Sequence, residues 1–488
     1  MEGHIAIEAA QGRCLIDGKW QAPAGGESLP VVDPSTGAAF GDIARGGAAD
    51  IEHAVAAAER ALDADWGMTE PAERGRILAR LGRLIERDFD HLWQLESRDT
   101  GKPVKQAKAD IAACARYFEF YGGAADKQHG ETIPYKNGYT VLTVREPYGV
   151  TGHIIPWNYP AQIFGRTIGG ALAAGNACVL KPAEDACQLP LVLAGLALEA
   201  GLPAGALNVV PGLGSEAGRA LAEHPRIQHI SFTGSPATGT LVQTAAAARN
   251  RPVTMELGGK SPQIVFADAD LESALPFITA AIVQNAGQTC SAGSRLLVED
   301  SVADAFTTML AERFATLSTG PGHLDPDCGP LINGRQKARV DGFLARAERD
   351  GLPVLARGRL LDDLPPGGFY VPPVMVGDVP PDHPLAQEEV FGPVLSVLRF
   401  RDEAEAVRLA NATEFGLVAG LWTRDGGRQL RVARKLRAGQ VFVNNYGAGG
   451  GVELPFGGVG RSGFGREKGF EALAHFSETK TIAIQHGV

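Results

Sequence analysis

Short β-rich runs alternate with alanine-rich helical segments along most of this chain. Clear runs are ACVLK at 177–181, LNVVPG at 207–212, HISFTG at 229–234 and PVTMEL at 252–257. Strands separated by helices in strict alternation form a mostly parallel sheet with helices on both faces. The alternation resumes after residue 260, in PQIVFAD, SRLLVED and PVLSVLRF. The sequence therefore predicts an α/β protein.

The length of the chain predicts more than one core. Its 488 residues exceed the size at which a single hydrophobic core usually stops growing, about 250–300 residues. We therefore expect two large domains. Among the helices, Asp50 is expected to cap one whose apolar stripe runs from Ile51 to Leu62. A second helix is expected to begin near Pro71.

Two segments stand apart from the alternating pattern. TIPYKNGYTVLTVRE at 132–146 predicts a hairpin, because Asn137-Gly138 suits a tight turn with positive φ. TKTIAIQ at 479–485 predicts a further strand with little after it to pack against. Exposed strand edges pair readily with another chain. We therefore expect a homo-oligomer, either a homodimer or a homotetramer.

Charge and cysteine usage argue against several classes of protein. The formal net charge of −10, with no long run of Lys or Arg, argues against nucleic-acid and anionic-membrane partners. No stretch approaches the ~20 apolar residues of a membrane helix, and the N-terminus lacks a signal-peptide core. Six scattered cysteines without a CxxC pair favour a reducing compartment. We expect a cytoplasmic protein without a metal site.

Several short motifs pair a reactive side chain with turn residues, which an ordinary core does not need. They are PWN at 156–158, MELGGK at 255–260, GQTC at 287–290 and EEVFGP at 388–393. A cysteine in such company is a candidate nucleophile, since a thiolate attacks electrophilic carbon. The alternative for any single cysteine is an inert, buried side chain.

These motifs resemble those of the aldehyde dehydrogenase superfamily, and the resemblance runs nearly end to end. Three more motifs complete the family's order and approximate spacing: KPAE (181–184), FTGSPATG (232–239) and PFGG…SGFGRE (455–467). The resemblance implies a Rossmann-like NAD-binding domain, a second α/β catalytic domain and a small β oligomerisation arm.

The resemblance also suggests how the chain divides. The expected boundaries are 1–125 and 147–256 for the NAD-binding domain, 257–446 for the catalytic domain, 126–146 and 471–488 for the arm, and 447–470 for a return segment that closes the active site.

The resemblance implies that Cys290 attacks an aldehyde to give a hemithioacetal and then a thioester. Asn158 and the backbone N–H of Cys290 would stabilise the oxyanion. Glu256, before the turn-forming pair Gly258-Gly259, would activate the hydrolytic water. The alternatives are an Asn158 that closes its own loop and a Glu256 on the surface at a strand end. Acylating relatives that use coenzyme A commonly lack this glutamate, so its presence favours release of the free acid.

Glu467 matches a second family carboxylate that can relay protons away from the site. Its usual partner in many relatives is a lysine eleven residues past the start of PWN, where this chain has Thr167. The relay role of Glu467 therefore stays open.

The phosphates of the cofactor are expected at residues 232–239, where a strand leads into a helix N-terminus. There the resemblance implies contacts from Gly234, Ser235 and Gly239. GLGSEAG at 212–218 has one residue too many before its last glycine for a dinucleotide fingerprint, and is read as a turn near the adenine end at most.

The other cofactor contacts come from three of the motifs. Lys181 and Glu184 match residues that hold the adenosine ribose. A carboxylate at 184 would repel a 2′-phosphate, so NAD is expected rather than NADP. At the nicotinamide ribose the expected residues are Glu389 and Phe391, and the residues lining the same channel are Pro156 and Trp157.

The aldehyde is expected to carry an acidic or polar tail. Arg166 stands where relatives acting on succinic semialdehyde also carry an arginine that grips the distal carboxylate. Those relatives have a second arginine where this chain has Gln284. The alternative is an Arg166 paired with an internal carboxylate. Aromatic aldehydes are further candidates, because the glycine-rich segment 444–458 predicts a roomy tunnel.

Two other classes of protein are alternatives to an aldehyde dehydrogenase. A cysteine hydrolase working without nicotinamide predicts a histidine beside the nucleophile, yet no histidine lies near a motif. A non-catalytic paralogue predicts loss of Cys290, Glu256 or Asn158, and all three are present.

Overall fold

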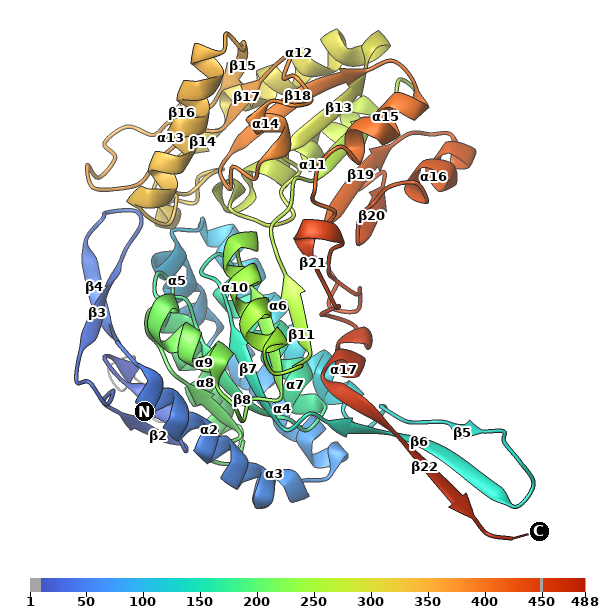
Figure 1. The fold of residues 1–488 in the computed structure, drawn as a ribbon. Helices are drawn as coiled ribbons and strands as arrows, with labels where there is room; N and C mark the ends of the chain where they lie inside the picture. Colours follow the sequence, from blue (N-terminus) through green and yellow to red (C-terminus); the bar gives the residue numbers. More distant parts are fainter. Residues whose placement is uncertain (1–9, 448–450, 488) are drawn as a thin grey trace.

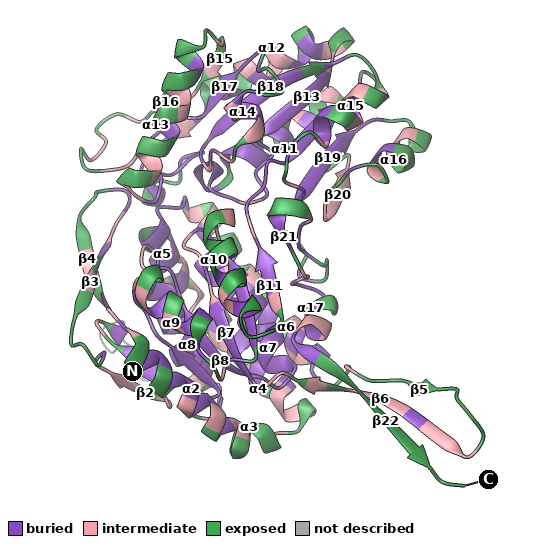
Figure 2. Ribbon diagram, in the orientation of Figure 1, coloured by how far each residue is buried: buried purple, intermediate pink, exposed green. Residues whose placement is uncertain are grey.

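The structure is a computed structural model that describes residues 10–447 and 451–487, and it contains two large sheets (Figure 1). Each sheet has its own buried apolar cluster, as the length of the chain predicts. Figure 2 shows the strands of both sheets buried beneath partly exposed helices. The α/β fold class is therefore confirmed.

The first sheet has eight strands, and its five central strands are parallel. In spatial order they are β2 (Lys19–Gln21), β1 (Cys14–Ile16), β9 (Leu207–Val209), β8 (Ala177–Lys181), β7 (Val150–Ile154), β10 (His229–Thr233), β11 (Val253–Glu256) and β21 (Gly463–Phe464). The helices of this part are α2 (Ala48–Asp63), α3 (Asp65–Met68), α4 (Pro71–Arg87), α5 (Phe89–Thr100), α6 (Val104–Ala124), α7 (Pro160–Ala173), α8 (Gln188–Glu199), α9 (Arg219–Glu223) and α10 (Pro236–Ala247). The strands predicted at 177–181, 207–212, 229–234 and 252–257 are β8, β9, β10 and β11.

The second sheet has seven strands, parallel except for β15. In spatial order they are β15 (Val354–Arg357), β17 (Val374–Val376), β18 (Val394–Phe400), β13 (Arg295–Glu299), β12 (Pro262–Val265), β19 (Val418–Trp422) and β20 (Gln440–Val443). The accompanying helices are α11 (Leu271–Val283), α12 (Asp300–Thr316), α13 (Gly334–Arg349), α14 (Pro384–Gln387), α15 (Glu403–Ala410) and α16 (Gly426–Ala433). Two small pairs complete the body: β3 (Ser28–Val32) with β4 (Ala39–Ala44), and β14 (Ser318–Thr319) with β16 (Arg359–Leu360).

A three-stranded arm projects from the body after the short helix α17 (Glu471–His475) (Figure 1). It consists of β22 (Ser477–Gln485), β6 (Tyr139–Pro147) and β5 (Thr132–Ile133), and β22 is an edge strand. The predicted hairpin is present, and Asn137-Gly138 forms the predicted tight turn, in which Tyr139 N donates to the carbonyl of Lys136 at 3.2 Å and Gly138 has a positive φ of 80°. Ile133 pairs with Val141, so the turn is one part of a longer connection between the strands.

The start of α2 also differs from its prediction. The N-cap is Gly47, and Asp50 lies at the third helical position, where its Oδ2 accepts a hydrogen bond of 2.9 Å from Gly47 N. The carboxylate thus makes the backbone half of a capping box from inside the helix, because Gly47 has no side chain to make the other half. No helix among the described residues is long and apolar enough to cross a membrane.

Candidate active site

A cavity of about 740 Å³ lies where the loops after β7, β10 and β11 face the loop that precedes β13. Ligands of open α/β sheets bind at such carboxyl ends of strands. Most of the predicted site residues line this cavity: Pro156, Trp157, Asn158, Arg166, Gly234, Ser235, Glu256, Cys290, Glu389 and Phe391. Four do not line it: Lys181, Glu184, Gly239 and Glu467.

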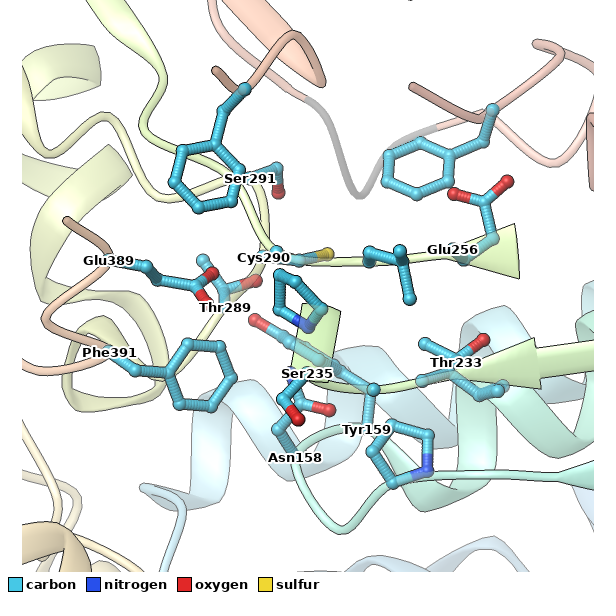
Figure 3. Close-up of a pocket in the computed structure, with 18 of the residues that line it drawn as sticks. Asn158, Tyr159, Thr233, Ser235, Glu256, Thr289, Cys290, Ser291, Glu389 and Phe391 are labelled. Carbon is cyan, nitrogen blue, oxygen red and sulfur yellow. The ribbon is translucent and has the colours of Figure 1, made fainter. Parts of the chain in front are cut away.

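Cys290 sits at the centre of the cavity, between Glu256 on one side and Glu389 with Phe391 on the other (Figure 3). It is half-buried, whereas the other five cysteines are fully buried. Burial raises the pKa of its thiol to about 12, and the charge of Arg166 opposes that rise. The resting nucleophile is therefore a thiol that needs a base or a nearby positive charge to ionise.

The loop before Cys290 is built on three successive residues with positive φ: Asn285, Ala286 and Gly287, at 50°, 53° and 69°. A Cβ on Gly287 would lie 2.2 Å from the carbonyl oxygen of Gly392, so this position needs glycine. The tightly wound loop holds the thiol toward the cavity.

Asn158 follows β7 and is braced from the cysteine loop. Its Nδ2 donates to the carbonyl of Gln288 at 3.0 Å. Asn285, which the sequence analysis missed, donates from Nδ2 to the carbonyls of Asn158 at 2.9 Å and Gln288 at 3.1 Å. A side-chain amide carries two hydrogens. Asn158 therefore uses one hydrogen to bind the cysteine loop rather than to close its own loop, and its second hydrogen can serve as a donor to the cavity.

Glu256 ends β11 and is buried, which contradicts the surface alternative. Neither of its carboxylate oxygens has a hydrogen-bond partner among the described residues. Burial raises its pKa well above the usual range, and Arg166 opposes that shift. A buried carboxyl group that faces a cavity and has a raised pKa is suited to general-base chemistry near neutral pH.

Gly258 and Gly259, which follow Glu256, allow other parts of the chain to pack close to the backbone. Neither has a positive φ. A Cβ on Gly258 would lie 2.3 Å from Glu389 Oε2, and one on Gly259 would lie 2.3 Å from the carbonyl oxygen of Cys290. Neither glycine is therefore needed for a left-handed backbone conformation, and both are needed for the space that a Cβ would fill. Two empty Cβ positions let the base, the nucleophile loop and Glu389 pack together.

Glu389 and Phe391 form the other side of the cavity. Glu389 Oε1 accepts a hydrogen bond of 3.0 Å from the backbone N–H of Gly259, and burial raises the pKa of this carboxyl group to about 7. Phe391 has a φ of 59°, and its ring meets that of Trp157 edge-on at a centroid distance of 5.4 Å. Two fixed rings and an acceptor make a slot for a planar, polar group.

The β10–α10 turn offers the expected anion site. Ser235 is the N-cap of α10, its Oγ accepts from Thr238 N at 3.3 Å, and Pro236 occupies the first turn. A helix N-terminus opening onto a cavity suits phosphate oxygens. Gly239 has a packing role, because a Cβ there would lie 2.6 Å from the Leu257 side chain.

Lys181 ends β8, and its Nζ donates to Glu184 Oε2 at 2.8 Å. Residues 214–218 form a π-helical turn that leads into α9. The tight turn expected there is therefore not formed.

Three features of the chain provide donors and acceptors suited to a dinucleotide. They are the slot at Glu389, the turn at Ser235 and the Lys181–Glu184 pair.

Arg166, on α7, is buried and ion-paired with Glu467 through Nε. Its Nη2 donates to Thr233 Oγ1 at 3.0 Å, and its guanidinium carbon lies 5.3 Å from the centroid of the Phe456 ring. The geometry therefore matches the alternative of an internal carboxylate partner, although the side chain also borders the cavity.

Glu467 continues this polar cluster away from the cavity. Its Oε1 accepts from Ser231 Oγ at 2.6 Å, and Ser231 Oγ in turn accepts from Thr167 Oγ1 at 3.0 Å. Thr167 Oγ1 lies 2.7 Å from His153 Nδ1. A row of neutral side chains thus leads away from Glu467, through Ser231 and Thr167 to His153.

Lys468 is a cavity residue that the sequence analysis missed. It follows Glu467 directly, with a φ of 64°, and lines the cavity while its side chain is buried. Its Nζ lies 5.1 Å from the ring centroid of Phe456 and 6.0 Å from that of Tyr117. Burial lowers the pKa of this ammonium group to about 7. The sequence offers one signal for this residue, because Lys468 directly follows Glu467 at the end of the SGFGRE motif.

Comparison with known proteins gives consistent matches over the whole chain. The model of the aldehyde dehydrogenase family matches residues 20–482. The NADP/NAD-dependent aldehyde dehydrogenase PuuC of Escherichia coli is 43% identical, with 98% of this chain and 96% of that protein covered. Human retinal dehydrogenase 2 is 39% identical, with 98% and 93% covered.

Solved structures agree. One from Burkholderia cenocepacia, assigned as an aldehyde dehydrogenase, is 65% identical with a TM-score of 0.97, and covers 97% of this chain and 100% of its own. PnpE from Pseudomonas, in complex with nicotinamide adenine dinucleotide, is 40% identical with a TM-score of 0.95 over 98% of both chains.

Proposed function

This chain belongs to the aldehyde dehydrogenase family, and we propose that it oxidises an aldehyde to the free carboxylic acid through a thioester on Cys290. It is an oxidoreductase, and its cofactor is NAD. The observation that carries the mechanism is the convergence of Cys290, Asn158 and Glu256 on one cavity, which continues to the α10 N-terminus.

The first step is attack by the sulfur of Cys290. The thiol must lose its proton, because burial raises its pKa to about 12, and the charges of Arg166 and Lys468 favour the thiolate. A C–S bond then forms to the aldehyde carbon and negative charge moves to its oxygen. The second amide hydrogen of Asn158 and the backbone N–H of Cys290 stabilise this oxyanion.

NAD, which Ser235 at the α10 N-terminus and the Glu389–Phe391 slot would hold, would supply the hydride acceptor. Loss of hydride from the former aldehyde carbon leaves Cys290 carrying an acyl thioester. Glu256 then takes a proton from a water molecule that attacks the thioester carbon. A C–O bond forms, the C–S bond breaks, and the acid and the thiol are released. With a base in this place, water rather than coenzyme A is the acyl acceptor.

We propose Glu467 as a relay carboxylate whose partner here is Arg166 instead of a lysine. Its contacts with Arg166 and Ser231 connect the wall of the cavity with Thr167. Glu184 supports a preference for NAD over NADP, because a carboxylate repels a 2′-phosphate.

The domain boundaries are also a proposal: 1–125 and 147–256 for the NAD-binding domain, 257–446 for the catalytic domain, 126–146 and 471–488 for the arm, and 447–470 for the return segment. Membership of the two large sheets supports this division, and β21 shows the return segment adding a strand to the first sheet. The exposed edge β22 supports a homodimer or homotetramer. Six free cysteines support a cytoplasmic location.

For the substrate we propose an aldehyde with a polar or acidic tail, and aromatic aldehydes as further candidates. Gln162, Gln284 and Ser291 add polar groups to the cavity, and Tyr446 adds a ring. Of the glycine-rich segment 444–458, residues 448–450 lie outside the described residues.

The test mixes purified enzyme and NAD with a panel of aldehydes and follows absorbance of the reduced cofactor, with and without coenzyme A. We expect turnover independent of coenzyme A, and its loss in Cys290→Ser. A Cys328→Ser variant, which changes a buried cysteine away from the cavity, serves as the control. Turnover that requires coenzyme A would overturn the hydrolytic mechanism.

A further inference from the structure

We infer that residues 332–339, which include the start of α13, fix the two ends of the cofactor site relative to each other, and that Asn333 and Gln336 are positioning residues for NAD. The inference rests on the proposed function, because it concerns the same site. It assigns these residues no contact with the reacting atoms. They act through Asp185 at the adenosine end and through Phe391 at the nicotinamide end.

Asn333 connects α13 with the loop that follows β8. Its Nδ2 donates to Asp185 Oδ1 at 3.1 Å, and Asp185 directly follows Glu184, the residue proposed to bind the adenosine ribose. Figure 1 shows β8 in the first sheet and α13 beside the second. This hydrogen bond therefore joins the adenosine end of the site to the other half of the molecule.

The side chain of Asn333 has a second role within the helix. Its Oδ1 accepts a hydrogen bond of 2.9 Å from Gln336 N, as the N-cap of α13. An N-cap satisfies a backbone N–H for which the helix itself has no acceptor. One amide group thus holds both the loop of Asp185 and the first turn of α13, so a shift of either is passed to the other.

Gln336 continues this connection to the nicotinamide end. Its Nε2 donates to the carbonyl oxygens of Phe391 at 2.6 Å and Val390 at 3.2 Å. Arg339 lies on the same face of the helix, three residues further on, and donates from Nη2 to the carbonyl of Glu389 at 2.6 Å. The carbonyls of three successive residues are therefore held by one helix.

The conformation of Phe391 explains why this backbone needs support. Its φ of 59° lies in the left-handed region, which is uncommon for a residue that carries a Cβ. Such a conformation persists where the surrounding structure fixes it, and it occurs often at ligand clamps. Both hydrogens of the Gln336 amide serve this purpose. Loss of that amide would free the Phe391 ring to leave its place beside Trp157.

The same segment also contacts the loop of the nucleophile. Ile332 N donates to Gln288 Oε1 at 2.9 Å, and the carbonyl of Gln288 is the acceptor for Asn158. Residues 332–339 thus contact the adenosine end, the nicotinamide end and the cysteine loop. A change at one end of this segment is therefore expected to reach the other.

The first experiment measures the Kd for NAD by calorimetry in wild type, in two single variants and in the double variant Asp185→Asn/Asn333→Asp. Aspartate caps a helix as well as asparagine does, so Asn333→Asp keeps the cap and loses the donor to Asp185. We expect this variant to weaken NAD binding about 10-fold, the usual effect of losing a hydrogen bond to a charged group. Asp185→Asn, which leaves a side-chain oxygen to accept from Asn333, is expected to have a smaller effect.

The double variant reverses donor and acceptor, and it is expected to regain most of the affinity for NAD. Recovery would also show that Asn333→Asp leaves the fold intact. A double variant that binds NAD no better than Asn333→Asp would overturn the inference.

A second ligand separates coupling from a local effect at Asp185. ADP carries the adenosine and diphosphate of NAD and lacks its nicotinamide half. Asn333→Asp is expected to weaken NAD more than ADP, because it also loosens the backbone at Phe391. Gln336→Met, which removes the amide and keeps the length, is expected to weaken NAD and leave ADP unchanged. Equal losses for both ligands in Asn333→Asp would confine its effect to the adenosine end and refute the coupling.

Asn137→Asp is the matched control, because it adds the same charge in the exposed arm, where Asp before Gly suits the turn. It should leave the Kd of both ligands unchanged. A wild-type protein that binds NAD and oxidises no aldehyde would refute the proposed function. The inference about Asn333 and Gln336 would still be decided, because its readout is the Kd and not turnover.

Discussion

The guanidinium group of Arg166 is ion-paired with the carboxylate of Glu467, and both side chains are buried beside the nucleophile cavity. Each charge depends on the other, because an isolated buried charge is costly. The arginine also favours the ionised forms of Glu256 and Cys290. Arg166 thus has a role inside the protein before any substrate arrives.

Replacing Arg166 with Met is expected to lower stability by about 3–5 kcal/mol, because the buried carboxylate of Glu467 loses its partner. The double variant Arg166→Met/Glu467→Leu should recover much of that loss. Calorimetry of wild type, both single variants and the double variant measures the coupling. Losses that simply add in the double variant would show that the two charges do not stabilise each other.

Turnover is expected to rise with pH as the carboxyl group of Glu256 ionises. The carboxylate is the form of Glu256 that acts as a base, and burial raises the pKa of this group. The fraction of enzyme with ionised Glu256 therefore rises at a higher pH than it would for an ordinary glutamate. Stopped-flow and steady-state rates across pH separate thioester formation from hydrolysis. Glu256→Gln should keep a single burst of reduced cofactor and lose steady turnover.

The matched control for this experiment is Glu272→Gln, in the exposed first turn of α11. It should preserve both the burst and the pH profile. Steady turnover in Glu256→Gln close to that of wild type would rule out this residue as the base.

Asn158→Ala is expected to lower kcat by about 100- to 1,000-fold, the usual effect of removing one oxyanion donor. Asn285→Ala should have a smaller effect, because Asn285 acts by holding the carbonyls of Asn158 and Gln288. Steady-state kinetics of both variants, with exposed Asn137→Ala in the arm as the control, gives the comparison. A larger loss for Asn285→Ala than for Asn158→Ala would contradict the assignment of roles.

The two glycines after Glu256 should respond differently to alanine. A Cβ at 259 meets the backbone carbonyl of Cys290, which cannot move without displacing the nucleophile, whereas a Cβ at 258 meets the side-chain carboxylate of Glu389. Gly259→Ala is therefore expected to lower kcat, and Gly258→Ala to raise KM for NAD. Gly123→Ala, with open space at its Cβ, should do neither. Identical kinetic effects of Gly258→Ala and Gly259→Ala would refute this distinction.

Much of the fold could be predicted because its strands are local features. The strand at 177–181 is predicted with both its bounds correct. A short apolar run between polar and turn residues favours a buried strand over other structures. Asp50 shows the limit of such reasoning. The same carboxylate can cap a helix from its N-cap or from its third residue, and only the path of the chain decides.

The candidate site was predictable where a motif carries the chemistry, as at Cys290. It was not predictable where two distant side chains meet. Nothing in the local sequence shows that Arg166 faces Glu467, or that Asn285 turns back toward Asn158. Lys468 could not be placed because its partners, Phe456 and Tyr117, come from different segments of the chain.

The strand β21 has a consequence for biosynthesis. Glu256 pairs with β10 on one side and, through Gly463, with β21 on the other, and β21 is made only after the whole second sheet has been translated. A nascent chain can carry its reactive sulfur long before its hydrolytic carboxylate is locked in place. Assembly of the catalytic centre therefore awaits residues that follow the whole second sheet, and a chain terminated before Gly463 would lack the strand that pairs with Glu256.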